Sequence, residues 1–313
     1  MVLTSQIAQE LLARQLNNWD QARSNYEALG KVEVKEFTIN GFTLRVQFNP
    51  GRIQSSAAKV DAKSISERKC FLCPQNLPAA QEGIPFGDKY QLLVNPFPIF
   101  PQHFTIPSYE HVDQLIIDRY GDMFDLTKAL DEYVIFYNGP KCGASAPDHA
   151  HFQAGNKDFL TIEKDLYKIE KELLLKVEEA ILYASKDYLC NFFIIRSSSK
   201  EKALLLFKEI YNLLEVKAEE SEPMMNILTW YEGDVWNSCI FPREKHRPDC
   251  YFAEGEKNIL ISPASVDLGG VFITPLEKDF IKITDKDLLT ILKEVCISDS
   301  KMNSIINKIK DKV

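Results

Sequence analysis

The segment His149-Ala150-His151-Phe152-Gln153 constrains this chain more than any other, because it places two of only five histidines and a glutamine at alternating positions. Side chains two residues apart lie on one face of a β-strand. If the segment is a strand, both imidazoles and the amide project into one site. The preceding loop, residues 138–147, supplies glycines where backbone N–H groups could approach phosphate oxygens closely. The segment therefore indicates phosphate chemistry, although two histidines at this spacing are also typical of a polar strand face.

Length and charge exclude several classes of protein. The chain has 313 residues, enough for a sizeable core in one large domain or two of average size. Its net charge of -8 argues against a nucleic-acid backbone as the main partner. No apolar run approaches the roughly 20 residues that span a bilayer, and the N-terminus lacks the pattern of a signal peptide. Together with scattered cysteines, these features favour a cytoplasmic protein without a membrane or nucleic-acid partner.

Hydrophobic periodicity predicts a mixture of short strands and helices. In the first half we expect a helix at 5–29, a hairpin around Asn40-Gly41, strands at 90–95, 103–107 and 133–138, and a helix at 111–131. In the second half we expect helices at 162–181 and 200–213, strands at 191–195, 225–230, 235–241 and 258–262, and a Gly-then-strand segment at 267–273.

A pair of cysteines precedes the histidine segment. Cys70 and Cys73 have the two-residue gap that lets two thiolates reach one tetrahedral metal ion. His103 and His111 lie between this pair and His149, so imidazole ligands are available. The alternative is that the cysteines are two buried thiols in a turn.

These motifs occur in an order that resembles a known superfamily. A Cys-x-x-Cys pair, an Asn-Pro segment leading to a strand and a histidine, and a Gly/Ser-rich loop entering His-x-His-x-Gln resemble the histidine-triad and galactose-1-phosphate uridylyltransferase superfamily over residues 45–155. The phrase His-Ala-His-Phe-Gln-Ala is most similar to its nucleoside-diphosphate-sugar phosphorylase branch. One departure is an additional residue, assigned to Asp148, between Ser145 and His151.

The resemblance implies an α+β fold of two histidine-triad-like halves. Residues 1–155 would carry the metal and the nucleophile, and residues 156–313 would form a degenerate copy that completes the pocket. The strand and helix order expected in the first half agrees with a histidine-triad unit.

The resemblance also implies a role for each site residue. A structural zinc ion would be bound by Cys70, Cys73, His111 and His149, with His103 as the rival to His111. His151 would be the nucleophile. Gln153 would replace the third histidine of the histidine-triad hydrolases; an amide can donate a hydrogen bond to phosphate but cannot deliver a proton to a basic leaving group.

Several further residues are candidates for contacts with substrate. Ser145 is a candidate at the catalytic centre. The other candidates are polar or cationic residues of both halves: Asn95, Asn138, Gly143, Arg243 and Lys245, with Arg52, Lys59 and Arg68 as weaker ones. Arg243 and Lys245 belong to the cationic run 243–248, which could clamp phosphates or form an ordinary solvated face.

The predicted activity is nucleotidyl transfer or phosphorolysis through a covalent nucleotidyl-His151 intermediate. The expected donor is a nucleoside-diphosphate sugar or a dinucleoside polyphosphate, and the expected acceptor is phosphate or a sugar 1-phosphate. The chain could act as a homodimer. Two alternatives are a nucleotide hydrolase of the histidine-triad kind and a non-catalytic nucleotide-binding protein.

Overall fold

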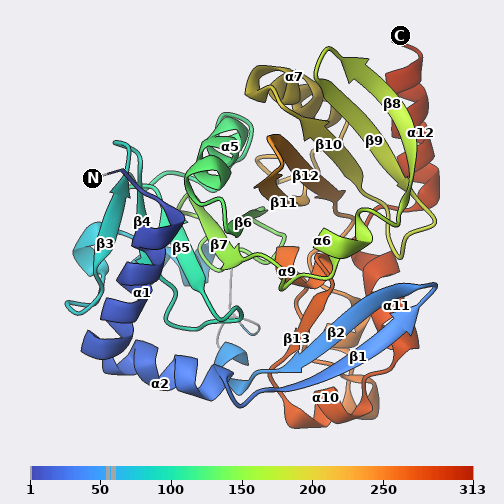
Figure 1. The fold of residues 1–313 in the computed structure, drawn as a ribbon. Coiled ribbons are helices and arrows are strands. Elements are labelled where there is room, and N and C mark those ends of the chain that lie inside the picture. The colour runs from blue at the N-terminus through green and yellow to red at the C-terminus, as the bar shows by residue number, and fades with distance from the viewer. Residues whose placement is uncertain (1, 54–56, 58–60, 313) are drawn as a thin grey trace.

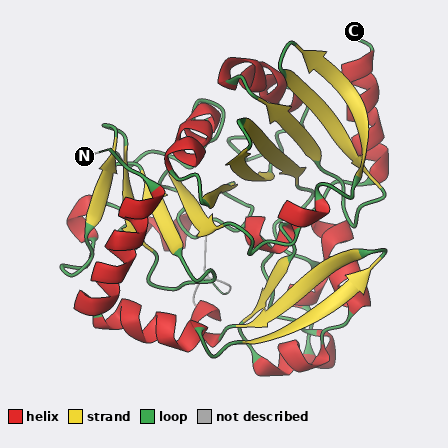
Figure 2. Cartoon of the chain, viewed as in Figure 1, coloured by secondary structure: helices red, strands yellow, loops and turns green. Residues whose placement is uncertain are grey.

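The chain folds around one large antiparallel sheet. The computed structural model describes residues 2–53, 57 and 61–312. The sheet has ten strands in the order β3-β4-β5-β7-β6-β11-β12-β10-β9-β8, and a smaller sheet has the order β1-β2-β13 (Figure 1). Helices pack around both sheets (Figure 2), so the predicted α+β class is confirmed.

The ten-stranded sheet consists of two five-stranded parts with the same internal order. Each part runs strand, strand, strand, helix, strand, strand, and in each the last strand inserts between the third and fourth. The parts meet where β6 pairs with β11 in antiparallel fashion. The first part comprises β3 (Gly83–Phe86), β4 (Tyr90–Val94), β5 (His103–Pro107), α5 (Tyr120–Ala129), β6 (Tyr133–Asn138) and β7 (His151–Asn156). The second comprises β8 (Glu170–Val177), β9 (Ala180–Lys186), β10 (Phe193–Ser197), α7 (Lys200–Tyr211), β11 (Met225–Glu232) and β12 (Val235–Pro242).

The repeated order identifies the counterpart of the histidine strand. His151 pairs with Pro107, the last residue of β5, and Trp236 on β12 pairs with Ser197, the last residue of β10. Trp236 therefore stands at the corresponding end of its strand, but its side chain lies in the same core as Phe152 and so faces the side of the sheet opposite His151. Its indole N–H donates to the carbonyl oxygen of Phe124 on α5, so it packs the second part of the sheet against the helix of the first part.

The smaller sheet joins distant parts of the chain. Its hairpin, β1 (Glu33–Ile39) and β2 (Phe42–Phe48), turns at Asn40 and Gly41, which both have positive φ as the predicted two-residue turn requires. β13 (Val271–Thr274) pairs with β2 in parallel, so a strand of the C-terminal half completes the N-terminal hairpin.

Two hydrophobic cores lie on opposite faces of the large sheet. One contains the apolar faces of α1 (Ser5–Asn18), α5, α7 and α12 (Asp299–Lys310). The other contains β1, β2 and β13 with α9 (Ser265–Leu268), α10 (Glu277–Lys282) and α11 (Asp285–Val295). Phe152 and Ala154 of β7 belong to the first core, so His151 and Gln153 face the second side of the sheet.

Several predicted elements differ from the structure. The expected helix 5–29 is two helices, α1 and α2 (Asp20–Leu29), because Trp19 between them is extended. The expected helix 111–131 begins only at Tyr120. The prediction of a charged helix at 162–181 was wrong. A short α6 (Ile162–Asp165) is followed by β8 and β9, whose pairing overrides the helical pattern.

The strand expected at 258–262 is irregular backbone between a 3-10 turn and α9. The described residues also form two short helices, α4 (Ala62–Ser66) and α8 (Asp249–Phe252).

The expected boundary between residues 155 and 156 stays a prediction, and strand β7 runs across it. In the part of the chain that the structure describes, none of the helices has the length and hydrophobicity needed to cross a bilayer.

Gly155 allows the histidine strand to pack tightly. A Cβ at this position would lie 2.3 Å from the Phe100 ring, which is fully buried and packed against Phe136 and Phe159. We therefore expect Gly155→Ala to lower the free energy of unfolding by about 1–3 kcal/mol, the usual cost of overpacking. Gly30→Ala is the control, because its nearest neighbour would lie at 3.4 Å. Denaturant unfolding that showed equal stability for the two variants would contradict this packing.

Candidate functional site

A cavity of about 500 Å³ opens on the side of the large sheet that carries His151. Strands β6 and β7, the Gly/Ser loop and segment 262–273 of the second half all contribute to its wall. The cavity brings together eight of the predicted site residues: His151, Gln153, Ser145, Asn95, Asn138, Gly143, Arg52 and Arg68. The two halves of the chain therefore share one pocket.

His151 presents one ring nitrogen to this cavity. Its Nδ1 lies 2.8 Å from the backbone carbonyl oxygen of His149, which can only accept, so Nδ1 carries the proton. Burial lowers the pKa of His151 to about 4, and the neighbouring charge of His149 also lowers it, so the ring is neutral near pH 7. Nε2 is thus left with a free lone pair, the form needed for a nucleophile or an acceptor.

Gln114 holds the backbone of His151 and was missed by the sequence analysis. Its Oε1 accepts from the His151 N–H at 2.7 Å, and its Nε2 donates to the carbonyl oxygens of His151 and Asn138 at 2.9 and 3.0 Å. The amide thereby links β6 and β7 where their direct pairing has ended. Gln114 lies in a stretch predicted to be helical, and a single glutamine gave no signal of this role.

A second layer of contacts fixes Gln114. The hydroxyl of Tyr137 donates to the Gln114 carbonyl oxygen at 3.0 Å and also to buried Glu222 of the second half. The other carboxylate oxygen of Glu222 accepts from the Ile116 N–H at 2.9 Å. Residues of the second half therefore support the loop that holds the histidine strand.

His149 does not share the strand face of His151. Strand β7 begins at His151, so the expectation that both imidazoles and the Gln153 amide lie on one face was wrong. The His149 ring turns away from the cavity, and its Nε2 lies 2.8 Å from the carbonyl oxygen of Ser108. Only His151 and Gln153 follow the predicted alternation.

The Gly/Ser loop packs against the second half of the chain. Gly143 has φ +92, and a Cβ there would lie 2.5 Å from the Cβ of Ala264, so both the conformation and the close approach require glycine. Asn138 accepts from Asn226 Nδ2 and from the backbone N–H of Ser265, both at 2.9 Å. These contacts fix the loop that carries Ser145 into the cavity wall.

Asn95 and Asp148 have identifiable structural contacts. Asn95 donates to Thr105 and accepts from the backbone N–H of Phe97, so both ends of its amide are engaged. Asp148, which the sequence analysis assigned as an additional residue, pairs with Arg68 at 2.9 Å and lies 3.7 Å from Nε2 of His111. Ser145 and His151, on either side of it in the sequence, line the same cavity.

The cationic run 243–248 contributes to the cavity through residues other than those predicted. Arg243 directs its five N–H groups to Asn226 and to backbone carbonyl oxygens, so it is a buried structural residue. Lys245 pairs with Asp249 and Glu294. Neither lines the cavity, so a contact of either residue with substrate stays a prediction that the cavity geometry does not support.

Three other arginines line the cavity from different segments. Arg52 donates to the Phe97 carbonyl oxygen, Arg68 binds Asp148, and Arg247 donates to the Ser262 hydroxyl and stacks on Tyr251. Lys59, another candidate, lies outside the described residues. The cavity thus has a cationic wall although the chain as a whole carries a net charge of -8.

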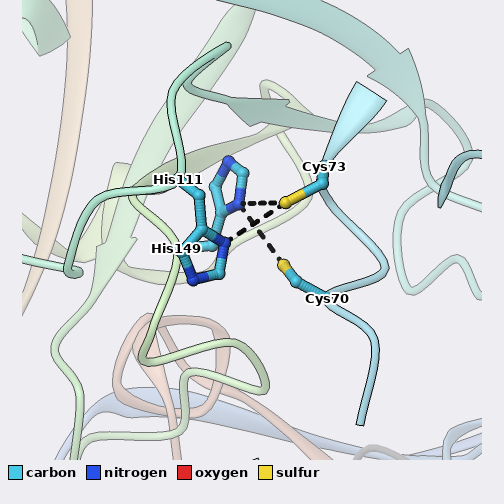
Figure 3. Close-up of side chains that lie close together, drawn as sticks. All are labelled: Cys70, Cys73, His111 and His149. Carbon is cyan, nitrogen blue, oxygen red and sulfur yellow. Dashed lines mark hydrogen bonds between the residues drawn. The ribbon is translucent and has the colours of Figure 1, made fainter. Parts of the chain in front are cut away.

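A compact group of metal-ligating side chains lies next to the histidine strand. Cys70, Cys73, His111 and His149 point toward one another, and their ligand atoms all lie within 4.8 Å (Figure 3). Nδ1 of His149 is 3.3 Å from the sulfur of Cys70, and Nδ1 of His111 is 3.2 Å from that of Cys73. Ligands of a tetrahedral ion, bound at about 2.0–2.3 Å, lie roughly 3.3–3.8 Å apart, so the group can hold a metal.

His103, the rival ligand, is absent from this cluster. It lies in β5 and contacts Gln153 instead.

Burial, followed by the adjacent thiol of Cys70, raises the pKa of Cys73 to about 11. A cation between the two sulfurs would reverse that effect by stabilising thiolates.

Comparisons with known proteins agree with this geometry. A sequence family described as a domain of unknown function, DUF4922, matches residues 11–156. Diadenosine tetraphosphate phosphorylase 2 of Saccharomyces cerevisiae is 31% identical over 117 residues, which make up 32% of this chain and 35% of the relative. The aligned segment therefore spans about a third of that relative's length.

Solved structures show the same fold over most of the chain. Yeast Ap4A phosphorylase in complex with AMP has a TM-score of 0.57 at 18% identity, covering 91% of this chain and 96% of that structure. The complex with Ap4A has a TM-score of 0.55 at 17% identity, covering 88% and 97%. The chain thus shares the fold of yeast Ap4A phosphorylase, and this likeness in fold fits the resemblance to a phosphorylase branch that the sequence predicts.

Proposed function

We propose that this protein is a nucleotidyltransferase that cleaves a dinucleoside polyphosphate, such as diadenosine tetraphosphate, with inorganic phosphate as acceptor. The observation that carries the proposal is the neutral His151 ring, whose Nδ1 is bound to the His149 carbonyl and whose Nε2 faces a cavity with a cationic wall. The likeness in fold to a phosphorylase crystallised with AMP and with Ap4A supports this choice of donor.

The reaction has two balanced steps. Nε2 of His151 attacks an α-phosphorus of diadenosine tetraphosphate, and the P–O bond to the β-phosphate breaks, which releases ATP and leaves AMP bound to the histidine. An oxygen of inorganic phosphate then attacks the same phosphorus and breaks the P–N bond. The products are ADP and a regenerated neutral His151.

Gln153 favours transfer over hydrolysis of phosphoramidates. Its amide lines the cavity and can donate a hydrogen bond to a phosphate oxygen, but it cannot supply a proton to an amine leaving group. A polyphosphate leaving group needs little protonation. The histidine-triad hydrolase is therefore the weaker alternative, and a nucleoside-diphosphate sugar remains a second donor to assay in parallel.

We also propose that the Cys70, Cys73, His111 and His149 group holds a structural zinc ion. Four protein ligands leave no open position, which is characteristic of a structural site. Such an ion would fix His149, whose carbonyl oxygen orients His151.

Zinc content is the first test of this site. We expect about one zinc ion per chain by elemental analysis, and we expect Cys73→Ser to lower both the metal content and the melting temperature, because metal binding contributes to folding. Cys250→Ser is the matched control, since this half-buried thiol lies outside the cluster. A metal-free wild type, or equal behaviour of the two variants, would rule out the zinc site.

Substitution of His149 and substitution of His151 should impair different properties of the protein. His151→Ala is expected to reduce release of ADP and ATP from diadenosine tetraphosphate by at least about 1,000-fold, because the nucleophile is lost, while zinc and fold remain. His149→Ala should lower metal content and melting temperature together. Identical behaviour of the two variants would refute the division of roles, and an inactive but nucleotide-binding wild type would favour the non-catalytic alternative.

Arg247 is the cation of the run 243–248 that we assign to the phosphates. Arg247→Met should raise the KM for diadenosine tetraphosphate by about 10- to 100-fold, since a hydrogen bond between charged groups contributes about 1.5–3 kcal/mol. Lys245→Met is the control and should change KM less than about twofold, because Lys245 does not line the cavity. If steady-state assays showed a larger increase in KM for Lys245→Met than for Arg247→Met, the phosphate contact would be assigned to Lys245.

A further inference from the structure

His103 is a buried histidine that the proposed mechanism does not use. It is the first residue of β5, has no exposed surface, and lies one strand away from Gln153. Its Nε2 is 3.0 Å from Oε1 of Gln153. The ring therefore touches the amide that lines the cavity.

The proton on the His103 ring can be assigned from geometry. The backbone N–H of Ile99 points at His103 Nδ1 from 3.1 Å, and an N–H can only donate, so Nδ1 must be the acceptor. A neutral imidazole then carries its proton on Nε2. This N–H must donate to Gln153, and the group that accepts it must be the amide oxygen.

The position of the ring is also fixed. The hydroxyl of Tyr26 donates to the His103 carbonyl oxygen at 3.0 Å and accepts from its backbone N–H at 3.3 Å. The Phe100 ring packs edge-on against the imidazole with the centroids 5.3 Å apart. His103 therefore cannot turn to offer Gln153 a different atom without breaking these contacts.

We propose that His103 is a positioning residue that sets the orientation of the Gln153 amide, so that its NH2 group and not its oxygen is presented to the substrate phosphate. The opposite orientation would bring the NH2 group against the His103 N–H, placing two donors face to face. Among the described residues, Gln153 Nε2 donates to no protein group, so its hydrogens are available to a ligand in the cavity. The identity of that ligand rests on the proposed function; the orientation of the amide does not.

The orientation can be tested without any enzymatic activity. Long-range proton–nitrogen NMR of the histidine rings in the full-length wild-type protein should show His103 protonated at Nε2 and unprotonated at Nδ1, with the five histidines assigned by single substitutions. Titration with AMP should then shift the side-chain NH2 signal of Gln153, identified by its loss in Gln153→Met. A proton on Nδ1 of His103, or an unmoved Gln153 signal while AMP binds, would overturn the proposal.

Two substitutions separate positioning from simple packing. His103→Gln can place an amide N–H near the position of Nε2, whereas His103→Leu cannot, and both remove the acceptor of the Ile99 N–H. We expect His103→Leu to lower kcat by about 10- to 100-fold with little change in KM, and His103→Gln to recover most of that loss. In Gln153→Met, adding His103→Leu should have no further effect on kcat, because His103 acts through Gln153.

The outcomes distinguish this proposal from the proposed function. Additive losses in the double variant, or equal impairment by His103→Gln and His103→Leu, would make His103 a packing residue only. A wild type that transfers no nucleotide from any donor would refute the proposed function, and the NMR measurements would still decide the orientation of Gln153.

Discussion

His149 connects the candidate metal centre to the candidate nucleophile through two different parts of one residue. Its imidazole faces Cys70 and Cys73, while its carbonyl oxygen accepts the Nδ1 proton of His151. An ion bound at the cluster would therefore fix the peptide group that selects the His151 tautomer. The proposed chemistry at Nε2 depends on this arrangement, because protonation of Nε2 would remove the lone pair with which the proposed mechanism attacks phosphorus.

The second half of the chain completes the wall of the cavity. Its segment 262–273 closes the cavity, Ala264 packs on Gly143, and Glu222 supports the loop of Gln114. Trp236, at the corresponding strand end of the second part, packs on the opposite face of the sheet against Phe124. The repeated strand order thus places the proposed nucleophile in the first part, while the second half supplies supporting contacts and Arg247 adds positive charge to the wall.

Local patterns in the sequence predicted the residues that meet, but not the contacts that depend on tertiary packing. The Cys70 and Cys73 spacing and the turn at Asn40-Gly41 are short-range signals, and both are found as expected. The sequence of the cationic run 243–248 does not show which side chains point inward. Arg243 donates hydrogen bonds to five acceptors inside the protein, whereas Arg247 reaches the cavity. Gln114 gave no signal because its role depends on the ends of β6 and β7 lying next to it. Strand β8 was predicted as helix from its charged, helix-like composition, but it pairs with β9 in a hairpin.

The most direct test of the account is to trap the covalent intermediate. The wild-type protein would be mixed with diadenosine tetraphosphate in the absence of phosphate, quenched with base to preserve the P–N bond, and analysed by intact-mass and peptide-mapping mass spectrometry. We predict one adenylyl group per chain, located on His151, that disappears as ADP forms when phosphate is added before the quench. Formation of ADP and ATP without any adduct, or an adduct on another residue, would contradict the account.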